Sequence, residues 1–281
     1  MLKKRWLVAI CAWVLMACPT SVSAANRTEH YSQPIKVMSY NIHFGVGAEG
    51  YNLRRTAKVI RQSQADIIGL QEVDVHYSER SHYEDQVRRL ARNLHMHYAY
   101  APIYDFAPTD GSKNRRQSGV AVLSRYPILA SHSHLQTRLS TEEPNPSPKQ
   151  LPGFLETVIQ VDDKPVTVYN AHLDYRDDRR IREIQVSEMM KIMAKRPDTQ
   201  FVLGDFNAAP GQLELAPLFK DYRNTLGSCQ HDCYTFPADH PKWQLDYVMV
   251  TPQVEVIKAS AVPEDKASDH RPVLATVRVP V

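Results

Sequence analysis

Short apolar runs that stop at a polar residue recur along the whole chain. The runs are rich in Val, Ile and Tyr and are separated by Pro, Gly, Asp and Asn, which is typical of β-strands bounded by turns. This feature restricts the chain to folds built around β-sheets. We expect strands over eight segments, 35–40, 67–70, 119–123, 157–161, 166–171, 201–203, 246–250 and 273–279.

Helical patterns lie between these strands. Leu53, Ala57 and Ile60 share one face of a helix that Asn52 can cap. Two further helices are marked by apolar residues at helical spacing. The first contains Val87, Leu90, Ala91 and Leu94. In the second, Ile181, Ile184 and Ile192 lie in line with Glu188, and Met189 and Met193 widen the apolar face. Many strands with few helices predict an α/β fold in which sheets pack together and helices lie outside. The Pro-rich stretch 143–148 is expected to be a loop.

Residues 1–24 are expected to be a secretory signal peptide. Residues 3–5 are basic, residues 6–18 form an apolar run, and Val22 and Ala24 are small residues placed like a cleavage site. The run is too short for a permanent membrane helix. We therefore expect a secreted or periplasmic protein.

The N-terminal segment leaves one alternative open. Leu15-Met16-Ala17-Cys18 also permits a lipoprotein anchored at Cys18. After the signal, residues 25–33 are expected to be a short linker, and residues 34–281 one domain, because no Gly/Ser linker, low-complexity run or repeat divides them.

Charge counts against nucleic acid as the main partner. The chain has 34 Lys and Arg against 31 Asp and Glu, a net charge of +3. The three surplus positive residues lie in the signal segment, so the mature chain balances at 31 minus 31, which is zero. A protein that acts chiefly on nucleic acid usually carries a basic excess or stripe.

Cys229 and Cys233 are the cysteines left after signal removal. In an oxidising compartment we expect them to form a disulfide that closes a short loop. A metal site is the alternative, but two thiolates and His231 fall short of a closed zinc site.

Six segments place Asn, Asp, Glu or His at or beside the end of an apolar run. Residues there sit on a rigid scaffold and face a common rim, where catalytic groups gather. The segments are Ser39-Tyr-Asn41, Leu70-Gln-Glu72, Asn170-Ala-His-Leu-Asp174, Leu203-Gly-Asp-Phe-Asn207, Leu245-Asp-Tyr247 and Ser268-Asp-His270. Each alone is compatible with an ordinary turn or cap.

Together, in this order and spacing, the segments resemble the endonuclease/exonuclease/phosphatase superfamily, from Val37 to Val277. Residues 66–74 and 122–127 are similar to secreted bacterial members, which in turn resemble the hydrolase-like domain of the Cwh43 proteins. The resemblance implies a four-layer sandwich like that of deoxyribonuclease I, with two packed mixed β-sheets flanked by helices. It also implies a metal-dependent hydrolase of phosphate esters, and a phosphodiesterase rather than a monoesterase, because the secreted members mostly cleave diesters.

The chemistry of phosphate-ester hydrolysis explains the metal-binding and acid–base residues. Glu72 is a hard carboxylate suited to Mg²⁺ or Mn²⁺, with Asn41 beside it and Asp269 as a second metal-side carboxylate, for one or two ions. Asp205 is suited to orient or deprotonate the attacking water. In the family's pattern, the carboxylate that corresponds to Asp246 pairs with the final histidine, His270.

The remaining candidates are donors to the phosphate. Asn207 can donate to the phosphate or steer the water, and His172 and His270 are candidate cationic donors to the phosphoryl oxygens. Arg80 can bind a substrate phosphate; a surface ion pair with Glu79 or Glu84 is an equal alternative.

The substrate stays open between nucleic acid and a lipid head group of the sphingomyelin or glycosylphosphatidylinositol type. Basic residues 113–116, on an expected loop, can line a nucleic-acid groove, whereas residues 151–155 can form an exposed apolar loop for lipid or begin a strand. A binding protein that has lost catalysis is disfavoured because none of the six segments is broken. No obligate protein partner is indicated, and we expect a monomer.

Overall fold

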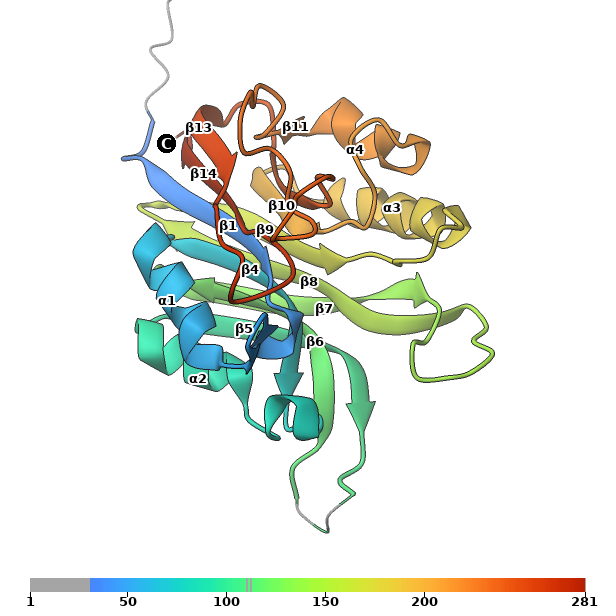
Figure 1. Cartoon of the computed structure of the whole chain (residues 1–281). Coiled ribbons are helices and arrows are strands. Elements are labelled where there is room, and N and C mark those ends of the chain that lie inside the picture. The colour runs from blue at the N-terminus through green and yellow to red at the C-terminus, as the bar shows by residue number, and fades with distance from the viewer. Residues whose placement is uncertain (1–30, 110, 112, 281) are drawn as a thin grey trace, which may run out of the picture.

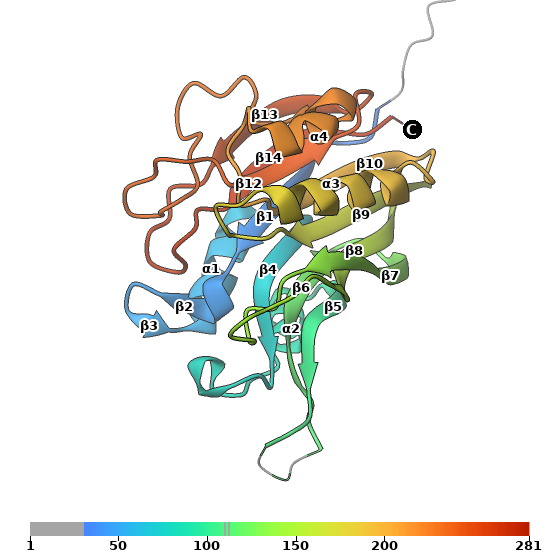
Figure 2. The same cartoon turned by 90° about the vertical axis from the view of Figure 1, so that its right-hand side faces the viewer.

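The computed structural model describes residues 31–109, 111 and 113–280, which fold into four layers (Figures 1 and 2). Two six-stranded sheets face each other. Helices α1 and α2 cover the outer face of one sheet, and α3 and α4 cover the outer face of the other. The predicted α/β sandwich of two mixed sheets flanked by helices is confirmed. The expected signal peptide lies outside the described residues.

The first sheet has the strand order β13-β14-β1-β4-β6-β5, in which β1 and β4 are parallel and the other neighbours are antiparallel. Both ends of the described chain contribute to it. Its strands are β1 Ile35–Asn41, β4 Ile67–Val75, β5 His97–Phe106, β6 Arg116–Ser124, β13 Glu255–Ala261 and β14 Val273–Arg278. The elements beside it are α1 Leu53–Ser63, α2 Gln86–Leu94, the hairpin of β2 Val46–Gly47 and β3 Gly50–Tyr51, and the 3₁₀ turns η1 His43–Gly45 and η2 Glu79–Ser81.

The second sheet has the order β11-β12-β10-β9-β8-β7, in which β9 and β10 are parallel. Its strands are β7 Ile128–Arg138, β8 Lys149–Val161, β9 Lys164–His172, β10 Thr199–Asp205, β11 Arg223–Asn224 and β12 Asp246–Val250. Outside it lie α3 Arg180–Met193, α4 Ala216–Asp221 and the 3₁₀ turn η3 Leu213–Leu215.

Central strands are apolar on both faces because each face meets another layer. In β1, Val37 packs between the two sheets, while its neighbour Met38 packs toward α1 and α2. In β9, Val168 packs between the sheets and Tyr169 packs toward α3. Successive side chains of a strand point to opposite faces, so strands in the middle of four layers carry continuous apolar runs.

All eight predicted strands are present, and most extend beyond their predicted bounds. Strands β5, β7 and β13 and helix α4 were not predicted. The first helix begins after Asn52, whose side chain accepts the backbone N–H of Arg55 as expected. The third helix occurs where expected, but its predicted face is partly wrong. Ile184 is 43% exposed, and Val186 is buried instead.

Two loop predictions are corrected by the structure. Residues 151–155 lie inside β8, where Phe154 and Leu155 are buried in the core, so they form no exposed apolar loop. Arg116 begins β6 rather than lying on the preceding loop. The end of the expected linker also pairs with the C-terminal strand region, because the backbone N–H of Ser32 donates to the carbonyl of Val279.

A buried amide joins the two sheets at a β-bulge. The bulge interrupts the pairing of β4 with β6 between Leu70 and Val73. Asn170, on β9 of the opposite sheet, donates from Nδ2 to the carbonyls of Leu70 at 2.9 Å and Ala121 at 2.8 Å. Its Oδ1 accepts from Gln71 Nε2 at 2.7 Å. One side chain of the second sheet thus satisfies the backbone of the first where its ladder is disturbed.

We predict that Asn170→Leu lowers the free energy of unfolding by about 3 kcal/mol, because each buried polar group left unsatisfied costs about 1–3 kcal/mol. Urea denaturation followed by circular dichroism measures the change. Asn93→Leu, at an exposed position of α2, is the matched control and should stay within about 0.5 kcal/mol of the parent. Equal stability of the Asn170 variant and the parent would contradict this role for the amide.

Candidate active site

The polar ends of strands from both sheets meet at one edge of the sandwich. Asn41, His172 and Asp205 are the last residues of β1, β9 and β10. β12 runs antiparallel to β10 and places Asp246 opposite Asp205. His270 lies in the segment just before β14. The fold therefore brings together residues that the sequence spreads over more than two hundred positions.

Glu72 reaches this edge by leaving regular strand geometry. It lies in the bulge of β4 with a φ of 53°, a left-handed conformation that is unfavourable for a residue with a side chain. Asn41 Nδ2 donates to Glu72 Oε1 at 3.0 Å and to Asp205 Oδ2 at 3.0 Å. The Asn41 oxygen accepts the backbone N–H of His43 at 3.0 Å. Its neighbours thus orient the amide, which bridges carboxylates from different sheets.

A tight turn after β10 presents Asp205 and Asn207. Asn207 has a φ of 48°, and its backbone N–H donates to Asp205 Oδ1 at 2.9 Å. A Cβ at Gly204 would lie 2.3 Å from the carbonyl oxygen of Ala171, so only glycine lets the strands approach this closely. Asp205 is buried, with one oxygen held by the turn and the other by Asn41.

Asp246 and His270 form a buried hydrogen-bonded pair. Asp246 Oδ2 lies 2.8 Å from His270 Nδ1, and His270 Nε2 lies 3.6 Å from Asp205 Oδ2. Burial lowers the pKa of His270, but the carboxylates of Asp246 and Asp205 outweigh burial and raise the pKa to about 10. The ring therefore keeps its proton at neutral pH, and Nε2–H faces Asp205.

The loop before β12 holds this pair in place. Thr235 Oγ1 accepts the backbone N–H of Asp246 at 3.3 Å, and the ring of Phe236 lies 4.7 Å from that of His270. The backbone N–H of Arg271 donates to the carbonyl of Thr235. Sequence reasoning missed Thr235 and Phe236 because they lie in an irregular segment with no strand or helix periodicity to mark them.

His172 lies against Asn207 and two carboxylates of the site. Asn207 Nδ2 donates to the carbonyl of Leu173 at 3.0 Å and lies 3.1 Å from His172 Nε2. His172 Nε2 also lies 3.6 Å from Asp205 Oδ2 and 3.9 Å from Glu72 Oε1. The roles of His172 and Asn207 as donors to the phosphate stay predictions.

One buried group of three side chains has ligand atoms within 4.8 Å of one another among the described residues, namely Asp205, Asp246 and His270. Its atoms are already committed to one another, since Asp246 bonds His270 and His270 faces Asp205. Mg²⁺ usually keeps several waters, for which a buried, internally bonded group leaves little room. We therefore regard this group as an acid–base relay rather than a magnesium site.

Glu72 is the carboxylate that fits a hard divalent ion. Its oxygen and that of buried Asp205 lie at the same distance from one Asn41 nitrogen, and the Glu72 side chain is 21% exposed. A carboxylate at an accessible edge suits Mg²⁺ or Mn²⁺. Asn41 donates to both carboxylates and its oxygen accepts a backbone N–H, so its role beside the metal stays a prediction.

The carboxylate of Asp269 lies near His43 rather than near Glu72. Its side chain is 44% exposed, and Oδ1 lies 3.6 Å from His43 Nδ1. Ser268 Oγ, next to it, donates to the carbonyl of Asn41 at 2.7 Å. The role of Asp269 as a second metal-side carboxylate stays a prediction.

Arg80 has an ion-pair partner that sequence reasoning missed. Its guanidinium binds the buried carboxylate of Asp74 through two hydrogen bonds of 2.9 Å, rather than Glu79 or Glu84. It also lies 3.4 Å above the ring of Phe44. Asp74 was not recognised as the partner of Arg80 because it lies inside a strand-like run of the sequence. Arg80 lines a pocket next to Glu72, which is compatible with its predicted contact with substrate.

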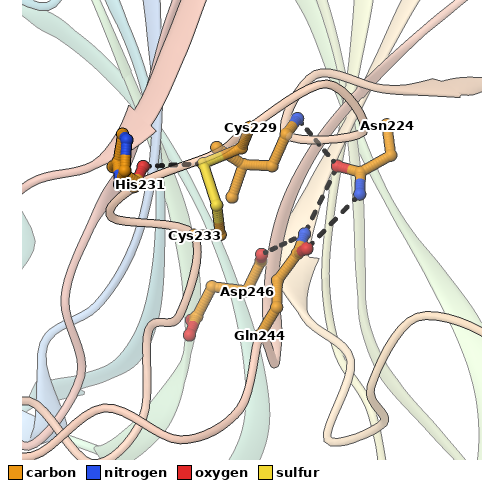
Figure 3. Close-up of a disulfide and its surroundings, with 7 residues drawn as sticks. Asn224, Cys229, His231, Cys233, Gln244 and Asp246 are labelled. Atoms are coloured by element: carbon orange, nitrogen blue, oxygen red, sulfur yellow. Dashed lines mark hydrogen bonds between the residues drawn. A yellow bond between two sulfur atoms is a disulfide. The ribbon is translucent and has the colours of Figure 1, made fainter.

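Cys229 and Cys233 are joined by a disulfide with a Cα–Cα distance of 5.8 Å. Figure 3 shows its surroundings, where Asn224 and Gln244 exchange hydrogen bonds and Gln244 donates to the carbonyl of Asp246. The bridged loop leads directly into the Thr235 segment.

Several solved structures share this architecture, and their similarity covers most of this chain. An endonuclease/exonuclease/phosphatase from Beutenbergia cavernae DSM 12333 is 20% identical, with a TM-score of 0.66 over 89% of this chain and 72% of that one. A mannosyl-6-phosphatase from Bacteroides thetaiotaomicron VPI-5482 is 18% identical, with a TM-score of 0.65 over 86% and 99%. The human nocturnin catalytic domain is 21% identical, with a TM-score of 0.63 over 89% and 96%.

A family model gives the same result from the sequence itself. It matches residues 38–270 and therefore includes all six polar segments. Enzymes of this family hydrolyse phosphate esters and typically need a divalent metal. The chain belongs to the endonuclease/exonuclease/phosphatase family.

Proposed function

We propose that this protein is a secreted phosphodiesterase that uses a divalent metal and a water molecule activated by Asp205. The observation that carries the proposal is the line of Asp246, His270 and Asp205 beside Glu72. It combines a carboxylate that can accept a proton with an imidazolium that can donate one. Metal-assisted hydrolysis of a phosphate ester can use both beside a metal-binding carboxylate.

The contacts of each site residue suit it to one step of phosphate-ester hydrolysis. Glu72 would hold the divalent metal, which would supply Lewis-acid stabilisation of the phosphoryl and leaving oxygens. Asp205 orients the attacking water and accepts its proton. His270 donates from Nε2 to a phosphoryl oxygen as negative charge grows. Asp246 keeps the imidazolium charged and correctly oriented.

An exported nuclease is the main alternative, and the surface charges count against it. Two of the three basic residues of the expected groove are already engaged, since Arg115 pairs with Asp105 at 2.6 Å and Arg116 donates to the carbonyl of Tyr77. Arg176 likewise pairs with the neighbouring Asp174. Tight binding of a polyanion depends on basic side chains that are free to contact phosphates.

A lipid head-group phosphodiesterase is the second alternative. Residues 151–155, the candidate for an exposed apolar loop, belong instead to strand β8, which was the alternative left open, and this removes the feature that favoured a lipid surface. In the described part of the chain, no helix has the length and apolarity to cross a bilayer. The basic and apolar pattern of residues 1–24 supports export, with anchoring at Cys18 as the alternative.

We predict that the purified mature protein hydrolyses bis(p-nitrophenyl) phosphate with Mg²⁺ and loses that activity with chelator. Plasmid DNA, RNA, p-nitrophenyl phosphate, sphingomyelin and phosphatidylinositol complete the panel. Chelator-sensitive cleavage of DNA or RNA in preference to small esters would make the protein a nuclease. If none of these substrates were hydrolysed with Mg²⁺ or with Mn²⁺, the proposed function would be refuted.

Asp205→Asn should lower kcat at least about a hundredfold, because the water loses the base that orients and deprotonates it. The fold should persist, since the amide oxygen keeps one of the two hydrogen bonds that Asp205 accepts, from Asn41 or from the backbone N–H of Asn207. Steady-state kinetics and a thermal melt measure the two effects. Asp221→Asn, at an exposed position, is the control for loss of a carboxylate. Near-normal activity of the Asp205 variant would remove it from the mechanism.

His270→Ala should be severely impaired, and Asp246→Asn less so, because Asp246 acts through His270. Losing a positioned donor typically costs about 10²–10⁴ in rate. Comparing kcat for both variants and the double variant tests the order. If Asp246→Asn retained full parental activity, Asp246 would have no part in the reaction.

A further inference from the structure

Helices α1 and α2 carry an unbalanced positive charge. α1 contains four Lys and Arg residues and α2 contains three, and neither contains Asp or Glu. The helices lie side by side on the outer face of the first sheet (Figure 1), and Arg61 of α1 donates to the carbonyl of Asn93 in α2 at 3.2 Å. Their exposed basic side chains form one surface, the basic face, which consists of Arg54, Lys58, Arg61, Arg88 and Arg92.

Most of the basic face has no carboxylate partner. In the described part of the chain, no ion pair or side-chain hydrogen bond engages Arg54, Lys58, Arg88 or Arg92. The acidic residues beside the helices are already engaged. Glu49 pairs with Arg55, and Glu84 pairs with Arg89. Asp85 caps α2 by accepting the backbone N–H of its third residue. These basic side chains are therefore free to meet a partner.

The spacing of the free basic residues brings like charges together. In α1, and again in α2, two of them are four positions apart and so lie on one side of the helix. Like charges at this spacing destabilise a helix. The opposite layer of the sandwich has the favourable arrangement, since Arg179 pairs with Glu183 at 2.8 Å at the start of α3. A negatively charged partner would offset the repulsion on α1 and α2.

An exposed tyrosine lies on the same side of the sheet as the basic face. Tyr98, on the edge strand β5, is 48% exposed. It is two residues from Tyr100, which packs against the apolar cluster beneath α1 and α2, so both side chains point to the helix-covered side. Basic residues attract lipid phosphates, and tyrosine rings are enriched where a bilayer meets water. The combination is typical of a surface that contacts a bilayer.

The basic face leaves the catalytic edge uncovered. β1 ends at the site with Asn41, whereas Lys36, near its other end, donates to Gln64 at the C-terminal end of α1 at 3.0 Å. Gln86, the first residue of α2, donates to the carbonyl of Phe44 near the site. Both helices thus run along the strands and away from the site. A flat surface placed against them lies parallel to the sheet, and substrate still reaches the strand ends.

We propose that the basic face binds peripherally to the surface of a bilayer that contains anionic phospholipids. Its Arg and Lys side chains contact the lipid phosphates, and Tyr98 contacts the boundary between head groups and acyl chains. A bilayer presents phosphates over a broad area, so it can engage charges that are spread over two helices without a groove. A nucleic-acid duplex offers only two rows of phosphates and no apolar layer for the tyrosine ring. The placement is independent of the ester that is hydrolysed at the catalytic edge.

Sedimentation with lipid vesicles tests the proposal, using the mature protein at low ionic strength. Vesicles of equimolar phosphatidylcholine and phosphatidylglycerol are compared with vesicles of phosphatidylcholine alone. The anionic vesicles should bind at least about a hundredfold more tightly, because each basic residue near an anionic surface contributes about a fivefold gain. Added salt should weaken the binding, since it screens the attraction.

Two sets of substitutions separate the basic face from net charge. The basic-face variant combines Arg54→Gln, Lys58→Gln, Arg88→Gln and Arg92→Gln. Its partition onto anionic vesicles should fall at least about a hundredfold, and either half of the set, in α1 or in α2, should lower it about twentyfold. The matched control loses the same charge from exposed positions in or beside α3 and α4, through Arg180→Gln, Lys191→Gln, Lys195→Gln and Lys220→Gln. The control should bind nearly as tightly as the parent.

A thermal melt checks the fold of each variant. The basic-face variant should melt no lower than the parent, because the substitutions remove repulsion between like charges. If the fourfold variant did not fold, the two half sets would carry the test.

Three results would overturn the proposal. The parent could show no preference for anionic vesicles, or the control could lose as much binding as the basic-face variant. In the third, the parent binds a duplex oligonucleotide more tightly than anionic vesicles at the same salt, and the basic-face variant loses that binding. The face would then be a nucleic-acid surface. None of these measurements depends on hydrolysis, so failure of the proposed function would be seen separately.

Discussion

The amide of Asn41 joins the two halves of the site. Asn41 and Glu72 belong to the first sheet and Asp205 to the second, so one nitrogen fixes a distance across the sandwich. Ser268 ties the backbone of Asn41 to the segment that carries His270. Neither sheet alone contains the metal-side carboxylate together with the proton-accepting one. The chemistry therefore depends on packing the sheets in one register, which the core between them provides.

The parts of the fold that were predictable are those whose residues follow a regular period. Buried central strands such as β1 and β10 are apolar on both faces and were recognised, whereas edge strands β5, β7 and β13 carry mixed polar sequences that resemble loops. The buried face of α3 was predicted wrongly at Ile184, because an apolar residue on a helix need not face the core.

The sequence predicted which residues form the site better than it predicted the contacts between them. Strand ends are visible in a sequence, but the direction of a hydrogen bond is set by neighbours that lie far away in the chain. The backbone N–H of His43 turns the Asn41 amide, and the carbonyl of Leu173 turns that of Asn207. The pairing of Arg80 with Asp74 likewise needed the bend of the chain around η2. Thr235 had no sequence signal because its role is to accept the backbone N–H groups of Leu245 and Asp246 from within an irregular loop.

Rigidity and selectivity have separate sources in this site. The reacting groups are held by hydrogen bonds at the strand ends and in the loops that follow them, so they can serve any phosphate ester that reaches them. The pocket beside Glu72 is bounded instead by η2 and by segments at strand ends, such as residues 138–142. Such segments tolerate substitution far better than the central strands do. Changes at Glu142 or Tyr104 can therefore alter which alcohol is accepted while Asn41, Asp205 and His270 keep the hydrolytic machinery unchanged.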